Sequence, residues 1–207
     1  MTYFEVLVEG YADTPAVREV LCRKFGLVEN EHFRIHAHKG RGKLPNNILA
    51  NPELKRQGLL DQLPAKLRGF SYLGQGVCVL VVLDVDRTQC HDLLRDLNQM
   101  LAQLPKRPLN VLFRLAIEET ESWFIADPTA IKKAFPKAKL GKLPETPDAI
   151  VGAWEKLAEA LGVDRNTVTG PDKYKWAEMI APHLNLDSPR SPSFRKLIDG
   201  INRNLHN

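Results

Sequence analysis

The sequence predicts an α/β protein: a mostly parallel sheet with helices on its faces, followed by a helical C-terminal extension. Apolar, strand-like runs alternate with segments of helical spacing, which is typical of a parallel sheet with crossover helices. Residues 77–83 are almost wholly apolar, as in a central strand buried on both faces. Prolines and lysines gather over 135–147, and only helical spacing follows.

In the first half of the chain, residues 3–8 are rich in β-branched and aromatic side chains and stop at Glu9-Gly10, so they predict a buried strand. Thr14-Pro15 indicates an N-cap followed by proline at the first helical position, with a helix up to Gly26. A second strand is expected over 32–38. Glycines alternating with cations over 39–43 indicate a flexible loop, and residues 46–68 show helical spacing that is interrupted near 51–52.

The second half begins with the central strand, which ends at Asp84-Val85-Asp86. A helix at about 89–104 leads to a strand over 109–117 and then to a helix that runs through Ile131. Three further helices are expected at about 148–161, 172–184 and 193–205. We expect a core domain over 1–134 and a helical extension over 135–207 that packs on it, because 207 residues suit one substantial core.

Composition excludes several classes of protein. No apolar run approaches the ~20 residues that span a bilayer, and no secretory leader is evident, so a cytoplasmic location without membrane contact is expected. The three cysteines are odd in number and widely spaced, which predicts reduced, packed thiols and neither disulfides nor a zinc site. A net charge of +4 is compatible with a polyanionic partner without requiring one.

Carboxylates follow two of the predicted strands. Glu9 comes directly after the first strand, and Asp84 and Asp86 end the central one. The carboxyl ends of parallel strands meet at one edge of a sheet, so Glu9 and Asp84 would converge if their strands are neighbours. Asp84 and Asp86, two residues apart, would face one side and could share Mg²⁺ or Mn²⁺. Acidic residues also end strands simply because they favour turns.

Two segments resemble the defining motifs of the Toprim domain, which occurs in topoisomerases, primases, recombination proteins and the nucleases of the overcoming-lysogenization-defect (OLD) group. They are residues 7–13 (LVEGYAD) and 81–87 (VVLDVDR), and the resemblance covers about the first 130 residues. Asp13 and residues 118–123 (EETESW) resemble further acidic positions of OLD-type nucleases. With residues 123–127 and 191–194, the whole chain also resembles small Toprim proteins encoded beside ATPases in bacterial anti-phage loci.

The resemblance implies a Toprim-like fold and a Mg²⁺-dependent endonuclease or nickase with two Mg²⁺ or Mn²⁺ ions. One ion would be held by Glu9, Asp13 and Asp84. The second would be held by Asp84, Asp86 and the Glu119/Glu121 segment, and a late lysine, Lys173 or Lys175, would assist catalysis. The resemblance further implies a separate ATPase subunit and an anti-phage role. DNA is favoured over RNA as substrate, and a homo-oligomer is compatible with the sequence.

Basic side chains give a weaker signal for nucleic acid. Lys39, Arg41 and Lys43 alternate with glycines, so they could neutralise phosphates, although a plain solvated loop explains them equally well. Lys173 to Trp176 interleaves cations, Lys175 among them, with aromatic residues, but packing explains the aromatic residues better. His36 and His38 lack a third ligand, which favours structural roles. The absence of a Gly-x-Ser-x-Gly elbow excludes a serine hydrolase of that type.

Two other functions stay open at this point. The same fold could form a regulatory module that binds nucleic acid or a phosphate-bearing ligand without cutting. It could also be a purely structural subunit, which would bind no divalent cation.

Overall fold

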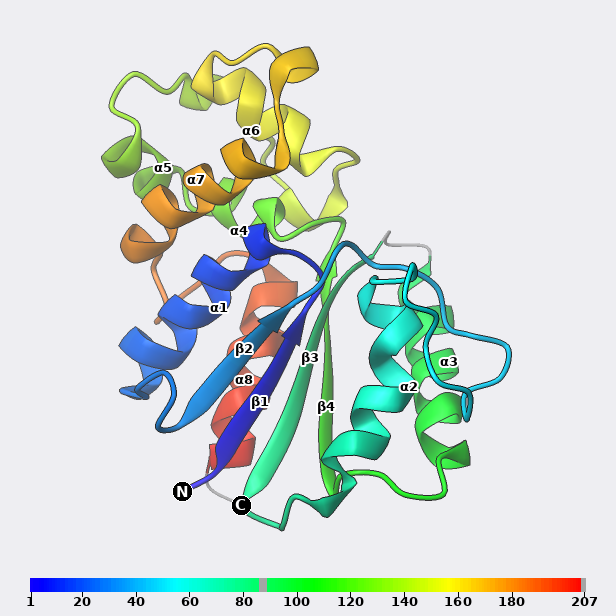
Figure 1. The fold of residues 1–207 in the computed structure, drawn as a ribbon. Coiled ribbons are helices and arrows are strands. Elements are labelled where there is room, and N and C mark those ends of the chain that lie inside the picture. Colours follow the sequence, from blue (N-terminus) through cyan, green and yellow to red (C-terminus); the bar gives the residue numbers. More distant parts are fainter. Residues whose placement is uncertain (86–88, 206–207) are drawn as a thin grey trace.

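The computed structural model describes residues 1–85 and 89–205, and it places one four-stranded parallel sheet at the centre of the protein (Figure 1). The strands are β1 (Tyr3–Val8), β2 (Phe33–Ala37), β3 (Val77–Val85) and β4 (Asn110–Ile117). Their order is β2-β1-β3-β4, and every pair is parallel. The predicted α/β class with a mostly parallel sheet is therefore confirmed.

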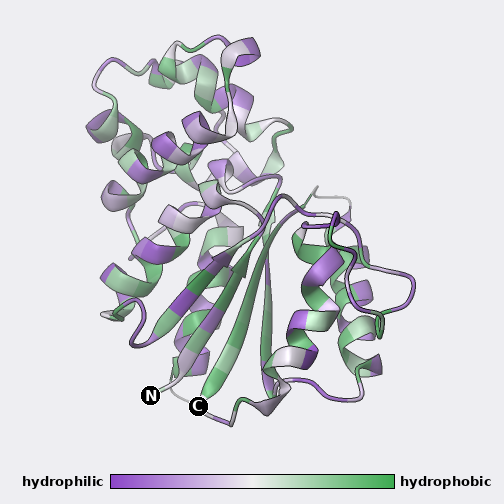
Figure 2. Ribbon diagram, in the orientation of Figure 1, coloured by the Kyte–Doolittle hydropathy of each residue, from purple (hydrophilic) through white to green (hydrophobic). Residues whose placement is uncertain are grey.

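Helices cover both faces of the sheet (Figure 1). On one face lie α1 (Thr14–Glu19), its continuation as a π-helical turn (Val20–Lys24), and the last helix, α8 (Pro192–Leu205). On the other face lie α2 (Leu59–Gly69) and α3 (Cys90–Gln103). Figure 2 shows that β3 is apolar along its length, whereas polar and apolar residues alternate along the helices, as burial of one helix face requires.

Four helices gather beyond the carboxyl ends of the strands (Figure 1): α4 (Glu121–Ile125), α5 (Pro128–Ala134), α6 (Ala153–Leu161) and α7 (Gly170–Ile180). Trp123 of α4 is buried and stacks on Phe194 with ring centroids 4.8 Å apart. Its indole nitrogen donates to Ser193 Oγ at 2.9 Å. This contact joins α4 to the start of α8, so the helical cluster and the sheet share one apolar core.

Three predicted helix boundaries were wrong. The helix expected from residue 46 begins only at Leu59, after an irregular segment that contains Pro52 and Gly58. The helix expected through Ile131 breaks between α4 and α5, because Pro128 lacks an N–H group and disfavours helical geometry in the residue before it. The helix expected from residue 148 begins at Ala153, because Gly152 before it has a positive φ of 77°.

The loop over residues 39–43, predicted to be flexible, is held by backbone hydrogen bonds. Gly40 donates to the carbonyl of Glu9 at 3.0 Å, and the carbonyls of Gly40 and Arg41 accept from the first two residues of α2. Asp61 of α2 accepts from the backbone nitrogens of Gly58 and Lys43. The loop is therefore fixed between the end of β1 and the start of α2.

We expect Gly58→Ala to destabilise the protein by about 1–3 kcal/mol, because it overpacks this junction. A Cβ at Gly58 would lie 2.6 Å from Gly42 Cα, which is backbone and cannot rotate away. Gly74→Ala is the matched control, since no heavy atom lies within 4 Å of its added Cβ. Urea denaturation measures both variants, and equal stabilities would contradict the close approach.

The cysteines and the length of the helices bear on two expectations that were drawn from composition. Cys22, Cys78 and Cys90 are free thiols, as predicted. Among the helices of the described residues, none has the length and apolar character needed to cross a membrane.

Candidate metal centre

Glu9 and Asp84 meet at the carboxyl edge of the sheet. β1 and β3 are neighbours in a register that pairs Val8 with Val82, so Glu9 leaves its strand beside Asp84. The backbone nitrogen of Asp84 donates to Glu9 Oε2 at 3.2 Å. The condition on which the predicted convergence depended, that the two strands are adjacent, is therefore met.

Asp84 carries the least satisfied oxygen of this edge. Its Oδ1 atom is buried and has no hydrogen-bond partner among the described residues. A buried carboxylate oxygen without a partner is costly, because it has lost water without gaining a donor. Asp86, the other predicted ligand on this strand, lies outside the described residues.

Asp13 lies in the 3-10 turn η1 (Tyr11–Asp13) that follows β1, and its side chain is 5% exposed. One carboxylate oxygen accepts from the backbone nitrogen of Gly10 at 2.7 Å, and the other accepts from Thr120 Oγ1 at 2.8 Å. Asp13 therefore links the turn after β1 to the acidic segment that follows β4.

That acidic segment contributes two further carboxylates. Glu121 opens α4 and is 6% exposed. Glu119 Oε2 accepts from the backbone nitrogen of Trp154, at the start of α6, at 3.0 Å. The structure thus brings Glu119 and Glu121 to the same edge as Asp13 and Asp84, in agreement with the electrostatic influence that these acids exert on one another.

Among the described residues, Lys173 of α7 is the cation that forms an ion pair with these acids. Its Nζ lies 3.9 Å from Glu121 Oε1 and 4.4 Å from the centroid of the Trp154 ring. Lys175, the other lysine considered for an assisting role, is exposed. Of the two lysines considered for this role, the structure therefore places Lys173 beside the carboxylates and Lys175 on the surface.

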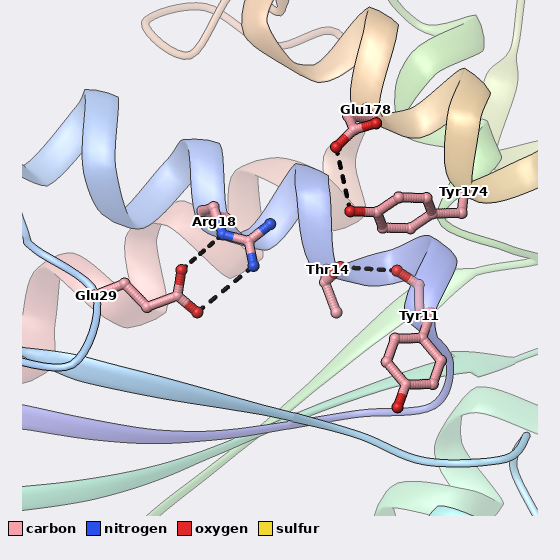
Figure 3. Close-up of polar contacts among 6 residues, drawn as sticks. All are labelled: Tyr11, Thr14, Arg18, Glu29, Tyr174 and Glu178. Atoms are coloured by element: carbon pink, nitrogen blue, oxygen red, sulfur yellow. Dashed lines mark hydrogen bonds and ion pairs between the residues drawn. The ribbon is translucent and has the colours of Figure 1, made fainter.

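Figure 3 shows the turn at the start of α1 beside α7, which are the elements next to Asp13 and Lys173. Thr14 Oγ1 donates to the carbonyl of Tyr11 at 2.7 Å, which fixes the turn at the start of α1. Tyr174 of α7 lies beside this turn, and its hydroxyl donates to Glu178 at 3.2 Å. Arg18 farther along α1 pairs with Glu29 at 2.8 Å. This docking of α7 against η1 carries Lys173 to the carboxylates.

Burial raises the pKa of every carboxyl group in this cluster. It raises the pKa values of Glu9 and Glu121 to about 7. The pKa of Asp84 lies well above its usual range, first because of burial and then because Asp13, Glu9, Glu121 and Glu119 repel its charge. Burial also raises the pKa values of Asp13 and Glu119, which the positive charge of Lys173 partly lowers.

Carboxylate oxygens are the ligands that Mg²⁺ and Mn²⁺ prefer, and the unsatisfied Asp84 Oδ1 is an atom that such an ion could satisfy. In residues 1–85 and 89–205, however, no three Asp, Glu, His or Cys side chains lie in an arrangement that could already hold an ion. Asp13 and Glu119 instead direct oxygens at protein donors. Ion binding would require some of these hydrogen bonds to be exchanged.

The predicted phosphate-binding residues divide into two groups. Arg41 reaches the site, where its guanidinium donates to the carbonyl of Asp84 and to Gln89 Oε1, each at 3.4 Å. Lys39, Lys43 and Lys175 are exposed. The structure thus brings one of the four predicted cations to the carboxylates.

The two histidines have structural partners, as predicted. His36 Nε2 lies 2.6 Å from Glu5 Oε2, and His38 Nδ1 lies 2.8 Å from the carbonyl of Val8. Two contributors to the site, Thr120 and Trp154, were not foreseen. Thr120 could have been noticed because it lies between two of the predicted ligands, whereas Trp154 has no signal in the local sequence.

Comparisons with known proteins support the family and the fold. The family described as "Domain of unknown function (DUF4276)" matches residues 8–202. No curated protein matches the sequence. The iodine-phased structure of the C-terminal region of the Xanthomonas campestris pv. campestris OLD protein has a TM-score of 0.50 and 14% identity, covering 100% of this chain and 97% of that chain. The mercury-phased structure of the same region gives 0.49 and 14%, with the same coverage. At this identity the likeness shows the fold alone.

Proposed function

We propose that this chain, which belongs to the DUF4276 family, is a Mg²⁺- or Mn²⁺-dependent nuclease that cleaves nucleic-acid phosphodiesters at the carboxyl edge of its sheet. The observation that carries the proposal is the convergence of buried acids around Asp84, whose Oδ1 lacks a partner among the described residues. Negative charges so close together are stabilised by a divalent cation. The fold shared with the OLD C-terminal region supports the proposal at the level of architecture.

The resemblance to OLD-type nucleases divides the carboxylates into two proposed ligand sets. Glu9, Asp13 and Asp84 would hold one ion, and Asp84, Asp86 and the Glu119/Glu121 segment would hold the other. Bound ions would supply a more acidic attacking water and neutralise charge on the phosphoryl oxygens. The protein would orient the substrate around them.

Lys173 and Arg41 lie beside the carboxylates, where their positive charge could balance the negative charge of a bound phosphate. Lys173 faces Glu121 and is held over the Trp154 ring, so its ammonium group could bind a phosphoryl or leaving oxygen without leaving the site. Arg41 is fixed beside Asp84 by the loop that joins β2 to α2 and is hydrogen-bonded to Glu9 at the end of β1. We assign Lys173 a catalytic role and Arg41 a substrate-binding role in this proposal.

The site must lose protons before it binds ions. Glu9 and Glu121 have pKa values of about 7, and metal ligands of this type bind as carboxylates. Cleavage is therefore expected to increase from pH 6 to pH 8. The separate ATPase subunit, the anti-phage role and the preference for DNA stay predictions that rest on the sequence resemblance.

Cleavage of labelled single-stranded and duplex oligonucleotides and of supercoiled plasmid tests the proposal. We expect products with Mg²⁺ or Mn²⁺ and none with excess EDTA, and restoration of the ion should restore cleavage. The assay requires DNA and RNA versions of each oligonucleotide. Binding of these substrates without any product under either ion would contradict the proposal and favour a non-cleaving regulatory module.

Lys173→Met is expected to lower cleavage at pH 7 by about tenfold or more, because loss of the cation raises the pKa values of Asp13, Glu119 and Glu121. Part of the loss should be recovered at pH 8.5, and Lys173→Arg should retain more activity than Lys173→Met. Lys175→Met, an exposed lysine on the same helix, is the control. Equal rate constants for Lys173→Met and Lys175→Met at every pH would contradict this role.

A further inference from the structure

A cleft of about 1090 Å³ runs along β4, which is an edge strand of the sheet. Residues of α3 line one side of the cleft, residues of α8 line the other, and the turn Pro147–Ala149 lies at the cleft as well. We call it the β4 cleft. None of the predicted site residues that the structure describes lines it, so it is distinct from the cluster that these carboxylates form.

The β4 cleft carries an excess of positive charge. Five cationic side chains line it, against three carboxylates: Arg114, Arg190, Arg195, Lys196 and Arg203, against Glu145, Asp148 and Asp199. Within the part of the chain that the structure describes, none of these five cations has a carboxylate oxygen within 4.0 Å. One of the three carboxylates, Asp148, already accepts from the backbone nitrogen of Ser193 at 2.8 Å. The cations are therefore left without partners of opposite charge.

The guanidinium of Arg114, one of these cations, is held in place by hydrogen bonds to the backbone. Its Nε donates to the carbonyl of Lys196 at 2.8 Å, and its Nη1 donates to the carbonyl of Phe113 at 2.7 Å. Its Nη2 has no acceptor among residues 1–85 and 89–205. The guanidinium lies against Gly200 of α8, where a Cβ would come within 2.3 Å of Nη2. The glycine makes room for a guanidinium that forms no ion pair with any carboxylate of the described residues.

A second cation faces this guanidinium. Burial lowers the pKa of Arg114, and the charge of Arg203 lowers it further. The charge of Asp199 acts in the opposite direction, although within the described residues it forms no ion pair with either arginine. Two cations this close favour an anion, because the anion relieves their repulsion and supplies a further acceptor.

The β4 cleft leads toward the carboxylates. Ile117 lines the cleft and ends β4, and it pairs with Val85, the residue after Asp84. The backbone nitrogen of the next residue, Glu118, donates to the carbonyl of Val85 at 2.6 Å. A chain of anions lying along β4 would therefore reach the edge of the sheet where the acids converge.

We infer that the β4 cleft binds the phosphate backbone of a nucleic-acid strand and directs that strand toward the carboxylate cluster. The inference deepens the proposed function and rests on it for the direction of the strand. A groove of unpaired cations binds the repeating charge of the backbone in preference to one sequence, so affinity depends strongly on salt. The substrate class is therefore a nucleic-acid strand bound with little sequence preference.

Fluorescence anisotropy with a labelled single-stranded oligonucleotide, measured in EDTA, tests the inference without cleavage. The cleft variant is Lys196→Gln/Arg203→Gln, whose two side chains are exposed and form no ion pair within the described residues. The control, Lys133→Gln/Arg165→Gln, removes the same charge from exposed positions outside the cleft. We expect the cleft variant to bind on the order of tenfold more weakly than the control.

The dependence of affinity on salt gives a second measure. For single strands the slope of log K against log salt changes by about 0.7 per lost phosphate contact, so the cleft variant should lose about 1.4 from this slope. Gly200→Ala should also weaken binding at unchanged net charge, because its methyl group displaces the guanidinium of Arg114. Equal affinity of the cleft variant and the control, as expected of a cleft that docks an acidic protein surface, would overturn the inference. So would wild-type protein that does not bind the oligonucleotide.

Failure of the inference can be told apart from failure of the proposed function. Binding that depends on the β4 cleft, without cleavage under Mg²⁺ or Mn²⁺, would overturn the nuclease proposal and leave the strand-binding cleft standing. Metal-dependent cleavage that Lys196→Gln/Arg203→Gln leaves unchanged, together with unchanged affinity, would overturn the cleft and leave the nuclease standing.

Discussion

Asp84→Asn is expected to reduce metal-dependent cleavage by on the order of 100-fold or more, because Asp84 is the carboxylate shared by both proposed ligand sets. The substitution keeps the shape of the side chain and removes its charge. It should also abolish most of the thermal stabilisation that Mn²⁺ gives to the wild-type protein. Single-turnover cleavage and thermal denaturation with and without Mn²⁺ measure the two effects.

The same variant should be more stable than the wild type when no ion is present. The pKa of Asp84 is well above its usual range in the folded state, so ionisation of this group at pH 8 opposes folding. Removal of the charge is expected to increase the free energy of unfolding in EDTA at pH 8 by about 1 kcal/mol or more. Asp92→Asn, at a side chain that is 64% exposed, is the control. An Asp84→Asn protein that cleaves normally, or that is less stable than the wild type in EDTA, would contradict this account.

The metal-free protein is expected to lose stability as the pH rises from about 4.5 to about 8. Glu9 and Glu121 titrate near 4.5 when unfolded and near 7 when folded, so between these values the folded state holds more protons. The stability is therefore greatest below this window and declines through it. Each unit of raised pKa is worth about 1.4 kcal/mol, which corresponds to a few degrees in Tm for a protein of this size.

Divalent ions should reverse this trend, because they bind the deprotonated carboxylates. The increase in Tm on addition of Mn²⁺ is expected to be larger at pH 8 than at pH 6. Glu121→Gln should reduce the dependence of metal-free stability on pH, whereas the exposed Glu31→Gln should leave it unchanged. A Tm in EDTA that is constant or increases from pH 5 to pH 8 would show that these carboxyl groups are not held in the folded state as described.

Much of the sheet could be predicted from the sequence, because burial on both faces leaves a strong local signal. The apolar run at 3–8 matches β1, and the run at 77–83 lies within β3. The segment 46–58 could not be assigned in this way. Its helical spacing is overridden by the hydrogen bonds that fix the 39–43 loop to the start of α2, and these are tertiary contacts.

The convergence of Glu9 and Asp84 followed from the same logic, since parallel strands deliver their carboxyl ends to one edge. Asp13, Glu119 and Glu121 were expected only from the resemblance to OLD-type nucleases. The positions of the cations could not be predicted in this way. Lys173 reaches Glu121 only because α7 docks against the turn after β1, and Arg114 meets Gly200 across 86 positions of sequence. Neither contact leaves a pattern within a single helix or strand. The sequence alone shows Arg114 only as a single cation within the strand expected over 109–117.

Anomalous scattering from a crystal of the wild-type protein grown with Mn²⁺ at pH 8 would show whether the carboxylate cluster binds the ion. We expect Mn²⁺ at roughly 2 Å from an Asp84 oxygen and from at least one oxygen of Glu9 or Glu121. Crystals that contain Mn²⁺ at the concentration used for cleavage, yet show no anomalous density at Asp84, would contradict it.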